Sequence, residues 1–328
     1  MAVTPQTNAT IEQIAEVIRQ GESFMVCGHE NPDGDCIGSI LAMIHVLETL
    51  GKPAIGLLAD DTQLDESLSY MPGADALVSA SEELAQADVF IAVDVPTHER
   101  LGKGARYHIA AAHTITLDHH AVDERISEFT YVDPDIAAAA MLVWELAKLL
   151  CDDIPKSVAD CCYAGLLTDT GGFRFQNADY DAFVAAGEMV AAGADPALAA
   201  QQAYQNMSLA SMRLGSIAVD RAVFVCGGAG VVSWVTAEDM RRLGAVKADT
   251  ESLVDTMRSI RGVRVACMLR EQDGVVRGSL RAKDSTDVSA IARRYNGGGH
   301  VAAAGFRMAV PMEQAVATIV SEFEAALL

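Results

Sequence analysis

The chain contains 328 residues with 45 acidic and 24 basic side chains, which gives a formal net charge of −21. This balance excludes the broad cationic surface that long nucleic acids require, although small anions can still bind through metal ions and a few arginines. Charged residues make up only 21% of the chain and the mean hydropathy is +0.20. We therefore expect a folded globular protein of two domains instead of a disordered chain.

The sequence offers no targeting or membrane signal. No basic segment followed by an apolar core opens the chain, and the longest apolar stretch, 136–144, is too short to span a bilayer. None of the seven cysteines has C-x-x-C spacing, and most lie in apolar runs, which favours buried thiols over disulfides. We expect a cytoplasmic protein that contacts no membrane. Its oligomeric state stays open, with a homodimer among the alternatives.

The first predicted strand, 24–27, ends before a loop that is dense in metal-binding residue types. This loop contains His29, Asp33 and Asp35, and it precedes a predicted helix whose apolar residues recur every three or four positions. Carboxylates are favoured at the amino end of a helix. One aspartate could serve only as a helix cap, but capping explains neither His29 nor the second aspartate. Gly38, just inside the helix, leaves room for a close backbone approach.

Two further predicted strands end on similar residues. The run 89–93 is followed by Asp94, and the run 114–117 is followed by the triplet Asp118-His119-His120. Short apolar runs of this kind are typical of buried parallel strands. Open α/β sheets bind ligands beyond the carboxyl ends of their strands, so we expect these side chains to meet in one crevice.

A fourth acidic candidate, Asp169, follows a predicted helix over 157–167 and by itself would be an ordinary turn aspartate. Carboxylates combined with imidazoles favour hard or borderline ions such as manganese, magnesium, iron or zinc. The candidates are too many for one ion with an open position. Two ions roughly 3.5–4 Å apart that share a carboxylate would use them all and would clamp an in-line displacement at phosphorus. The predicted ligands are His29, Asp33, Asp35, Asp94, His119 and Asp169.

A second candidate site lies near the carboxyl end of the chain. Three consecutive glycines precede His300, and Arg281 follows a predicted strand over 275–280. Glycine N–H groups can approach a phosphate closely, and an arginine can bind its oxygens with two hydrogen bonds. A glycine run alone is more often a flexible turn, but here a predicted helix through Val288 and Ile291 precedes it, which favours a built pocket.

A glycine and a proline break the chain after a predicted helix over 180–192, and the helical residues that follow could connect two domains. We expect a cleft between these domains to hold the substrate. The expected organisation is a first domain over 1–192, a helical linker over 193–215, and a second domain over 216–328 whose strands begin at 223–225 and 231–235.

These motifs resemble, in order, those of the DHH phosphoesterase superfamily, which is named for its Asp-His-His triplet. The carboxyl-terminal segment is similar to the DHHA1 domain, and the resemblance covers nearly the whole chain. It implies an α/β fold: an N-terminal DHH domain with a mostly parallel sheet flanked by helices, and a smaller C-terminal α/β DHHA1 domain that binds the substrate. The matching motifs are His29-x-x-Pro32-Asp33-x-Asp35, Asp94, Asp118-His119-His120, Asp169, Ser279-Leu280-Arg281 and Gly297-Gly298-Gly299-His300.

The two-domain length is similar to that of the nanoRNase and pAp phosphatase group. This resemblance implies a hydrolase that cleaves short oligoribonucleotides or 3′-phosphoadenosine 5′-phosphate (pAp) by two-metal hydroxide attack, with manganese preferred over magnesium. Its partners would be short nucleotides and not long nucleic acids. One alternative is a cyclic or linear dinucleotide phosphodiesterase acting on substrates such as c-di-AMP or pApA. Another is a nucleotide-binding regulator without turnover.

The resemblance also implies individual roles. Asp94 would bridge the two ions, Asp118 would orient His119, and His120 would face the phosphate as a cation or as an acid for the leaving group. His29 and Asp33 would complete the first ion's ligands, and Asp35, His119 and Asp169 those of the second. The substrate's terminal phosphate would be bound by Ser279, Arg281, Gly297, Gly298, Gly299 and His300.

Overall fold

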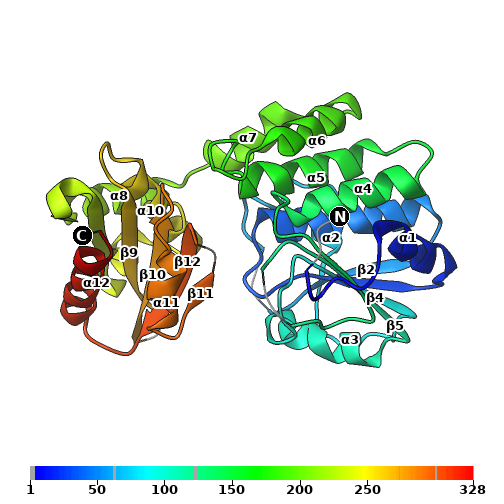
Figure 1. The fold of residues 1–328 in the computed structure, drawn as a ribbon, viewed down its shortest axis with the longest axis horizontal. Coiled ribbons are helices and arrows are strands. Elements are labelled where there is room, and N and C mark those ends of the chain that lie inside the picture. The colour runs from blue at the N-terminus through cyan, green and yellow to red at the C-terminus, as the bar shows by residue number, and fades with distance from the viewer. Residues whose placement is uncertain (1–3, 62–63, 122–123, 273, 300, 328) are drawn as a thin grey trace. The chain divides into compact units, whose positions relative to one another are not determined.

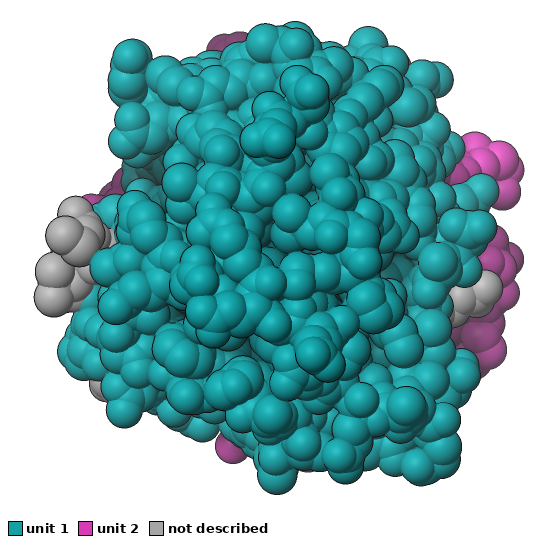
Figure 2. All heavy atoms as spheres, turned by 90° about the vertical axis from the view of Figure 1, so that its right-hand side faces the viewer, with its two compact units in different colours: residues 1–206 teal, residues 207–328 magenta. Residues whose placement is uncertain are grey.

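The computed structural model describes residues 4–61, 64–121, 124–272, 274–299 and 301–327 (Figure 1). The chain forms two compact units, Met1–Asn206 and Met207–Leu328 (Figure 2). Each unit has its own sheet and its own apolar core, so the predicted α/β class is confirmed. The segment expected as a helical linker contributes α7 (Pro196–Tyr204) to the first unit and α8 (Leu209–Asp220) to the second.

The first unit is built on six parallel strands in the order β3-β2-β1-β4-β5-β6. Because β1 pairs with β2 on one side and β4 on the other, the direction in which the chain adds strands reverses between β1 and β4. A crevice opens at such a reversal, since the connections on its two sides lead away from each other. The strands are β1 (Phe24–Cys27), β2 (Ala54–Leu58), β3 (Val78–Ser79), β4 (Val89–Val93), β5 (His113–Asp118) and β6 (Phe129–Val132).

Helices cover both faces of this sheet (Figure 1). The larger core lies under α1, α2, α4 and α5 and includes Val26 and Ile91, whereas Met25 and Phe90 point to the opposite face, where α3 packs. Strands buried on both faces are apolar at every position, which is why these runs were recognisable in the sequence. The helices are α1 (Ile11–Gln20), α2 (Gly34–Thr49), α3 (Ala105–Ala110), α4 (Ala139–Leu150), α5 (Lys156–Asp169) and α6 (Tyr180–Ala191), with short 3₁₀ turns η1 (Ala74–Ala76) and η2 (Glu99–Gly104).

Two glycines let α2 and α5 pack closely. A Cβ atom on Gly38 would lie 2.5 Å from the carbonyl oxygen of Cys161, and one on Gly165 would lie 2.8 Å from Asp35 Oδ1. Both distances are too short for real atoms, so the close approach predicted at Gly38 is confirmed. The packing brings the amino end of α2 against the carboxyl end of α5, where Asp169 is the last helical residue.

The second unit has a mixed sheet in the order β11-β12-β10-β9-β8-β7, in which only β8 and β9 pair in parallel. Helices α11 and α12 pack on one face, and α8 and α10 pack on the other. The strands predicted near 223–225, 231–235 and 275–280 are confirmed. The elements are β7 (Val223–Val225), η3 (Cys226–Gly228), β8 (Gly230–Val235), α9 (Ala237–Leu243), η4 (Ala248–Thr250), α10 (Leu253–Ser259), β9 (Val265–Gln272), β10 (Val275–Ala282), α11 (Val288–Arg293), β11 (Gly298–Gly299), β12 (Ala303–Met308) and α12 (Met312–Leu327).

Helices α6 and α7 follow one another with a bend of 117°. Asp195 caps α7 by accepting from the N–H groups of Ala197 and Leu198, and Pro196 occupies the first turn as predicted. Within the described ranges, no single helix is long and apolar enough to cross a membrane. Among the described residues, only α6 and α7 counted together have the length and the apolar composition of a membrane-spanning segment.

Charge is divided unequally between the two units. Residues 1–206 contain 32 acidic and 9 basic side chains, whereas residues 207–328 contain 13 acidic and 15 basic ones. The net charges are therefore −23 and +2. The acidity of the whole chain thus describes the first unit and not the second.

We predict that Gly38→Ala lowers the free energy of unfolding by about 1–3 kcal/mol, because the new methyl group must displace the backbone of α5. Urea titration of the purified variant measures this change. A variant as stable as the parent would show that α2 and α5 can separate at no cost.

Gly187→Ala is the matched control, since Gly187 is also a helical glycine but a Cβ atom on it would have nothing within 4 Å. Alanine there should increase stability by about 0.5–1 kcal/mol, because it limits the freedom of the unfolded chain. A loss of stability in Gly38→Ala together with a gain in Gly187→Ala would identify the close contact between α2 and α5 as the cause.

Candidate metal centre

The three predicted strand ends lie side by side, because β1, β4 and β5 are neighbours in the sheet. His29 follows β1, Asp94 follows β4, and Asp118 ends β5 just before His119 and His120. These residues stand beyond the carboxyl ends of the strands, at the reversal between β1 and β4. This is where open parallel sheets bind their ligands.

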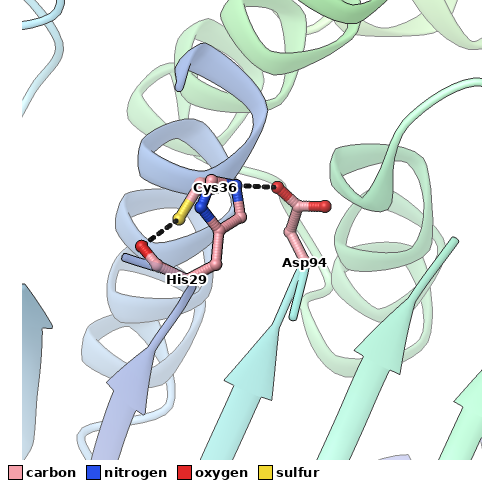
Figure 3. Close-up of side chains that lie close together, drawn as sticks. All are labelled: His29, Cys36 and Asp94. Carbon is pink, nitrogen blue, oxygen red and sulfur yellow. Dashed lines mark hydrogen bonds and ion pairs between the residues drawn. The ribbon is translucent and has the colours of Figure 1, made fainter. Parts of the chain in front are cut away.

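Asp94 lies at the centre of the cluster. It is only 1% exposed, and its φ of 54° is a left-handed conformation that costs a residue with a side chain about 1–3 kcal/mol. Its Oδ2 lies 3.3 Å from His29 Nε2 (Figure 3), and its Oδ1 lies 3.4 Å from His119 Nε2. The two oxygens of one carboxylate therefore face two different imidazoles.

The His29 side of the cluster is built by β1 and the start of α2. His29 Nδ1 donates to the carbonyl oxygen of Glu30 at 2.9 Å, which directs Nε2 toward the carboxylates. Asp33 caps α2 by accepting from the Cys36 N–H at 3.1 Å, and its Oδ1 lies 3.9 Å from His29 Nε2. Asp33 is therefore both a helix cap and a neighbour of His29, two roles that the sequence analysis considered as alternatives.

The His119 side brings together residues from three elements. His119 Nε2 lies 3.4 Å from Asp169 Oδ2 and 3.9 Å from Asp35 Oδ2. Asp35 is fully buried, and its two oxygens accept from the N–H groups of Ala139 and Ala140 at 2.6 and 2.9 Å. The first turn of α4, whose N–H groups lack partners within the helix, therefore holds this carboxylate in place.

Asp118 has a different partner from the expected one. Its Oδ1 accepts from His120 Nδ1 and from the backbone N–H of His119, both at 2.8 Å. The His119 ring places its Nδ1 3.3 Å from the carbonyl oxygen of Ile136. Because the chain turns after β5, the ring two residues beyond Asp118 returns to its carboxylate. Asp118 thus orients the ring of His120, and the carbonyl of Ile136 orients that of His119.

The cluster holds more negative charge than its own side chains offset. Burial and the charge of Asp94 raise the pKa of Asp35 to about 7, and burial with the charges of Asp35 and Asp33 raises that of Asp169 well above its ordinary value. Burial alone would lower the pKa of His29, but Asp94 and Asp33 raise it to about 9. Both kinds of shift indicate a site that needs additional cations.

The geometry fits divalent ions. Asp94 Oδ1 is buried without a hydrogen-bond partner among the described residues, although two imidazole nitrogens lie at 3.4 and 3.5 Å. Ligand atoms about 2.0–2.2 Å from one ion lie roughly 3.0–3.5 Å apart, so these spacings suit ligands of a shared metal. Among the described residues, three sets of side chains have ligand atoms within 4.8 Å of one another: His29, Cys36 and Asp94; Asp94, His119 and His120; and Asp35, His119 and Asp169.

Cys36 belongs to the first of these sets and was not predicted (Figure 3). Its Sγ faces the carbonyl oxygen of His29 at 3.9 Å, and burial raises the pKa of the thiol well above its ordinary value. Metals bind the thiolate, so Cys36 would have to lose its proton to act as a ligand. The sequence signal was its position directly after Asp35, inside the ligand-rich loop.

Arg100 is a second residue that sequence reasoning missed. It lies in η2, and its Nη2 donates at 3.3 Å to the Glu30 carbonyl that also accepts from His29. The backbone N–H of Glu30 donates in turn to the Arg100 carbonyl at 2.8 Å. A cation is thereby held beside the first imidazole. No motif pointed to it, because its contact depends on how η2 folds back onto the loop after β1.

Ser279 and Arg281 lie on the same face of β10, since they are two residues apart on one strand. Arg281 Nη1 donates to the Leu280 carbonyl at 3.0 Å, and its Nε lies 3.9 Å from Asp255 Oδ1. Its side chain is 28% exposed, so it remains accessible to an anion.

The glycine run has a partly structural explanation. A Cβ on Gly297 would overlap the Gly305 carbonyl oxygen of β12, and one on Gly299 would lie 2.6 Å from the Ala303 carbonyl oxygen. Gly298 has nothing within 4 Å, so only this glycine faces open space. The Gly297 N–H donates to the Ala292 carbonyl at 3.1 Å. The predicted ligand His300 lies outside the described residues.

Residues 23–166 match the N-terminal domain of the DHH family, and residues 228–327 match the DHHA1 domain. The chain belongs to the DHH phosphoesterase family. Members of this family are metal-dependent hydrolases of phosphoester bonds. The carboxylate and imidazole cluster of the first unit lies largely within the matched DHH segment.

Three similar proteins place the chain within this family. The bifunctional oligoribonuclease and PAP phosphatase NrnA of Thermus thermophilus is 30% identical over 293 residues, which are 89% of this chain and 86% of that protein. The structure of an exopolyphosphatase-related protein from Bacteroides fragilis has a TM-score of 0.89 at 25% identity and covers 96% of both chains. The cyclic-di-AMP phosphodiesterase PdeA of Listeria monocytogenes is 24% identical over 96% of this chain but only 49% of its own length.

We predict that Asp94→Ala abolishes hydrolysis and lowers the metal content of the protein. Removal of this carboxylate takes away the oxygens that face both imidazoles, so bound cations would lose their shared counter-charge. Elemental analysis of the purified protein beside initial rates measures both effects.

Asp153→Ala is the control, because Asp153 is an exposed aspartate in the loop after α4. It should leave metal content and rate unchanged. Full metal occupancy with a near-normal rate in Asp94→Ala would remove Asp94 from the centre of the site.

Proposed function

We propose that this protein hydrolyses short oligoribonucleotides and pAp with two divalent ions, manganese in preference to magnesium. The observation that carries the proposal is Asp94, whose two oxygens face two different imidazoles. When bound, the ions would make a hydroxide nucleophile available at neutral pH and would offset charge that develops on the phosphoryl oxygens. The chain's own residues bind the ions, orient the rings and position a proton.

Each ion has its own ligands. His29, Asp33 and Asp94 Oδ2 would hold the first ion, and Asp94 Oδ1, His119, Asp35 and Asp169 the second. The Nδ1 atoms of His29 and His119 face backbone carbonyls, which directs each Nε2 toward the carboxylates of the cluster. Asp94 is the only residue shared between these two sets, as the resemblance to the family implied.

His120 is the proposed acid. Its Nδ1 donates to Asp118 at 2.8 Å, because a carboxylate oxygen accepts the hydrogen bond. Nδ1 therefore carries a proton, and Nε2 would face the substrate. When Nε2 also carries a proton, it would donate that proton to the leaving oxygen of the cleaved ester.

The substrate assignment draws on the second unit and on the NrnA relative. Arg281, Ser279 and the open Gly298 would bind the terminal phosphate, together with His300. The PdeA relative supports the alternative of a cyclic or linear dinucleotide phosphodiesterase, but the chain covers only 49% of that protein. Both activities would use the same metal ligands, so only a comparison of substrates separates them.

We predict the highest turnover with pAp and with two- to five-nucleotide RNA, and a steep fall toward oligomers of about twenty nucleotides. Each further phosphate that meets the first unit, with its net charge of −23, is repelled. Initial rates with pAp, short RNA, a twenty-nucleotide RNA, c-di-AMP and pApA, in manganese or magnesium, test the proposal. Faster turnover of the dinucleotides would favour the alternative, and binding without any turnover would identify a regulator.

We predict that Arg281→Ala raises KM about ten- to a hundredfold and leaves the metal content unchanged. A charged hydrogen bond to phosphate contributes about 1.5–3 kcal/mol, and Arg281 belongs to the unit without the metal cluster. The same result is expected for His300→Ala. Arg241→Ala, which removes an exposed arginine on α9, is the control and should leave KM unchanged. An unchanged KM in Arg281→Ala for every nucleotide would contradict the assignment.

A further inference from the structure

Three arginines form a row across the sheet of the second unit. Arg277 on β10 is directly opposite Arg270 on β9 and directly opposite Arg307 on β12. Residues paired in this way share one face of the sheet, with Cβ atoms about 4.5–5.5 Å apart. Like charges at such positions repel each other, so the row is unfavourable unless an anion lies between the guanidinium groups.

The protein itself supplies little compensation. Among the described residues, no carboxylate lies within ion-pair distance of these three arginines, whereas Arg221 pairs with Asp239 in the same unit. Arg270 Nη1 donates to the hydroxyl of Thr250 at 3.1 Å. The Nε atoms of Arg270 and Arg277 are buried and have no hydrogen-bond partner within the described residues. A buried donor without a partner is unfavourable, and a bound anion would supply the missing acceptor.

The electrostatic surroundings agree with this interpretation. Burial lowers the pKa of Arg270, Glu251 partly offsets the effect, and the neighbouring charge of Arg277 lowers it further. The row also belongs to the unit with a net charge of +2, in a chain whose other unit has a net charge of −23. Cationic groups are thus concentrated where a polyanion would meet least repulsion.

The row lies apart from Arg281, with Ser279 between them on β10. Arg277 and Arg281 lie on the same face of β10 but four residues apart, a distance of about 14 Å along the strand. Side chains on one face stand roughly perpendicular to the sheet, so one phosphate group cannot contact both of these arginines. When one nucleotide is held at Arg281, other phosphates of the same oligoribonucleotide could therefore bind the row.

We propose that Arg270, Arg277 and Arg307 bind backbone phosphates of oligoribonucleotides, as a subsite beyond Arg281. The proposal rests on the proposed function and adds a basis for substrate choice. An oligomer of several nucleotides would contact both the row and Arg281, whereas pAp would reach Arg281 only. The row would then support activity on short RNA without contributing to activity on pAp.

The test compares Arg277→Ala and Arg307→Ala with the parent on a pentaribonucleotide and on pAp. The KM for the pentaribonucleotide should rise about tenfold in each variant, and the KM for pAp should stay unchanged. The dependence of log KM on log salt for the pentaribonucleotide should become shallower by about 0.7 for each arginine removed. Arg241→Ala removes the same charge from an exposed helix and should change neither quantity.

Arg307 is exposed, so its replacement leaves the core intact and keeps the test valid even if Arg277→Ala unfolds. An unchanged KM and salt dependence for the pentaribonucleotide in Arg307→Ala would overturn the proposal, as would an equal rise of KM for both substrates. If the parent hydrolyses neither substrate, the proposed function fails. The row is then tested separately by fluorescence anisotropy, in which a labelled pentaribonucleotide should bind the parent more tightly than Arg307→Ala.

Discussion

The buried carboxylate of Asp94 needs positive charge on both of its oxygens, and the first unit is arranged to supply it. β4 lies between β1 and β5, so the residue at its end has an imidazole on either side. The left-handed conformation of Asp94 turns its carboxylate toward both. Since that conformation is unfavourable for a residue with a side chain, the surrounding strands must hold it in place.

The remaining ligands depend on helix packing. Glycines at positions 38 and 165 allow α2 and α5 to approach until Asp35 and Asp169 lie near the same imidazole. The first turn of α4 then holds Asp35 through two backbone N–H groups. The site therefore relies on three helices as much as on the strands, and a small shift between α2 and α5 would separate two carboxylates that face one imidazole.

The division of charge between the two units has a chemical consequence. An acidic first unit attracts divalent cations and repels nucleic acid, whereas the row of Arg270, Arg277 and Arg307 in the second unit would attract phosphates. The metal ions would offset repulsion only locally, at the cleaved ester. Such a distribution suits substrates with few phosphates. The net charge of the whole chain, −21, does not reveal this distribution, because it is the sum of −23 for the first unit and +2 for the second.

The sequence by itself determined the strands 24–27 and 89–93, the ligand types at their ends and the family, because buried parallel strands and metal-binding motifs are encoded by neighbouring residues. It did not determine that Asp118 holds the ring of His120, that Cys36 and Arg100 lie beside His29, or that Gly298 is the one glycine of the run 297–299 that faces open space. Nor did it reveal the row formed by Arg270, Arg277 and Arg307. Only the tertiary structure decided these contacts, because they depend on strand order, strand register and helix packing, which pair residues far apart in the chain.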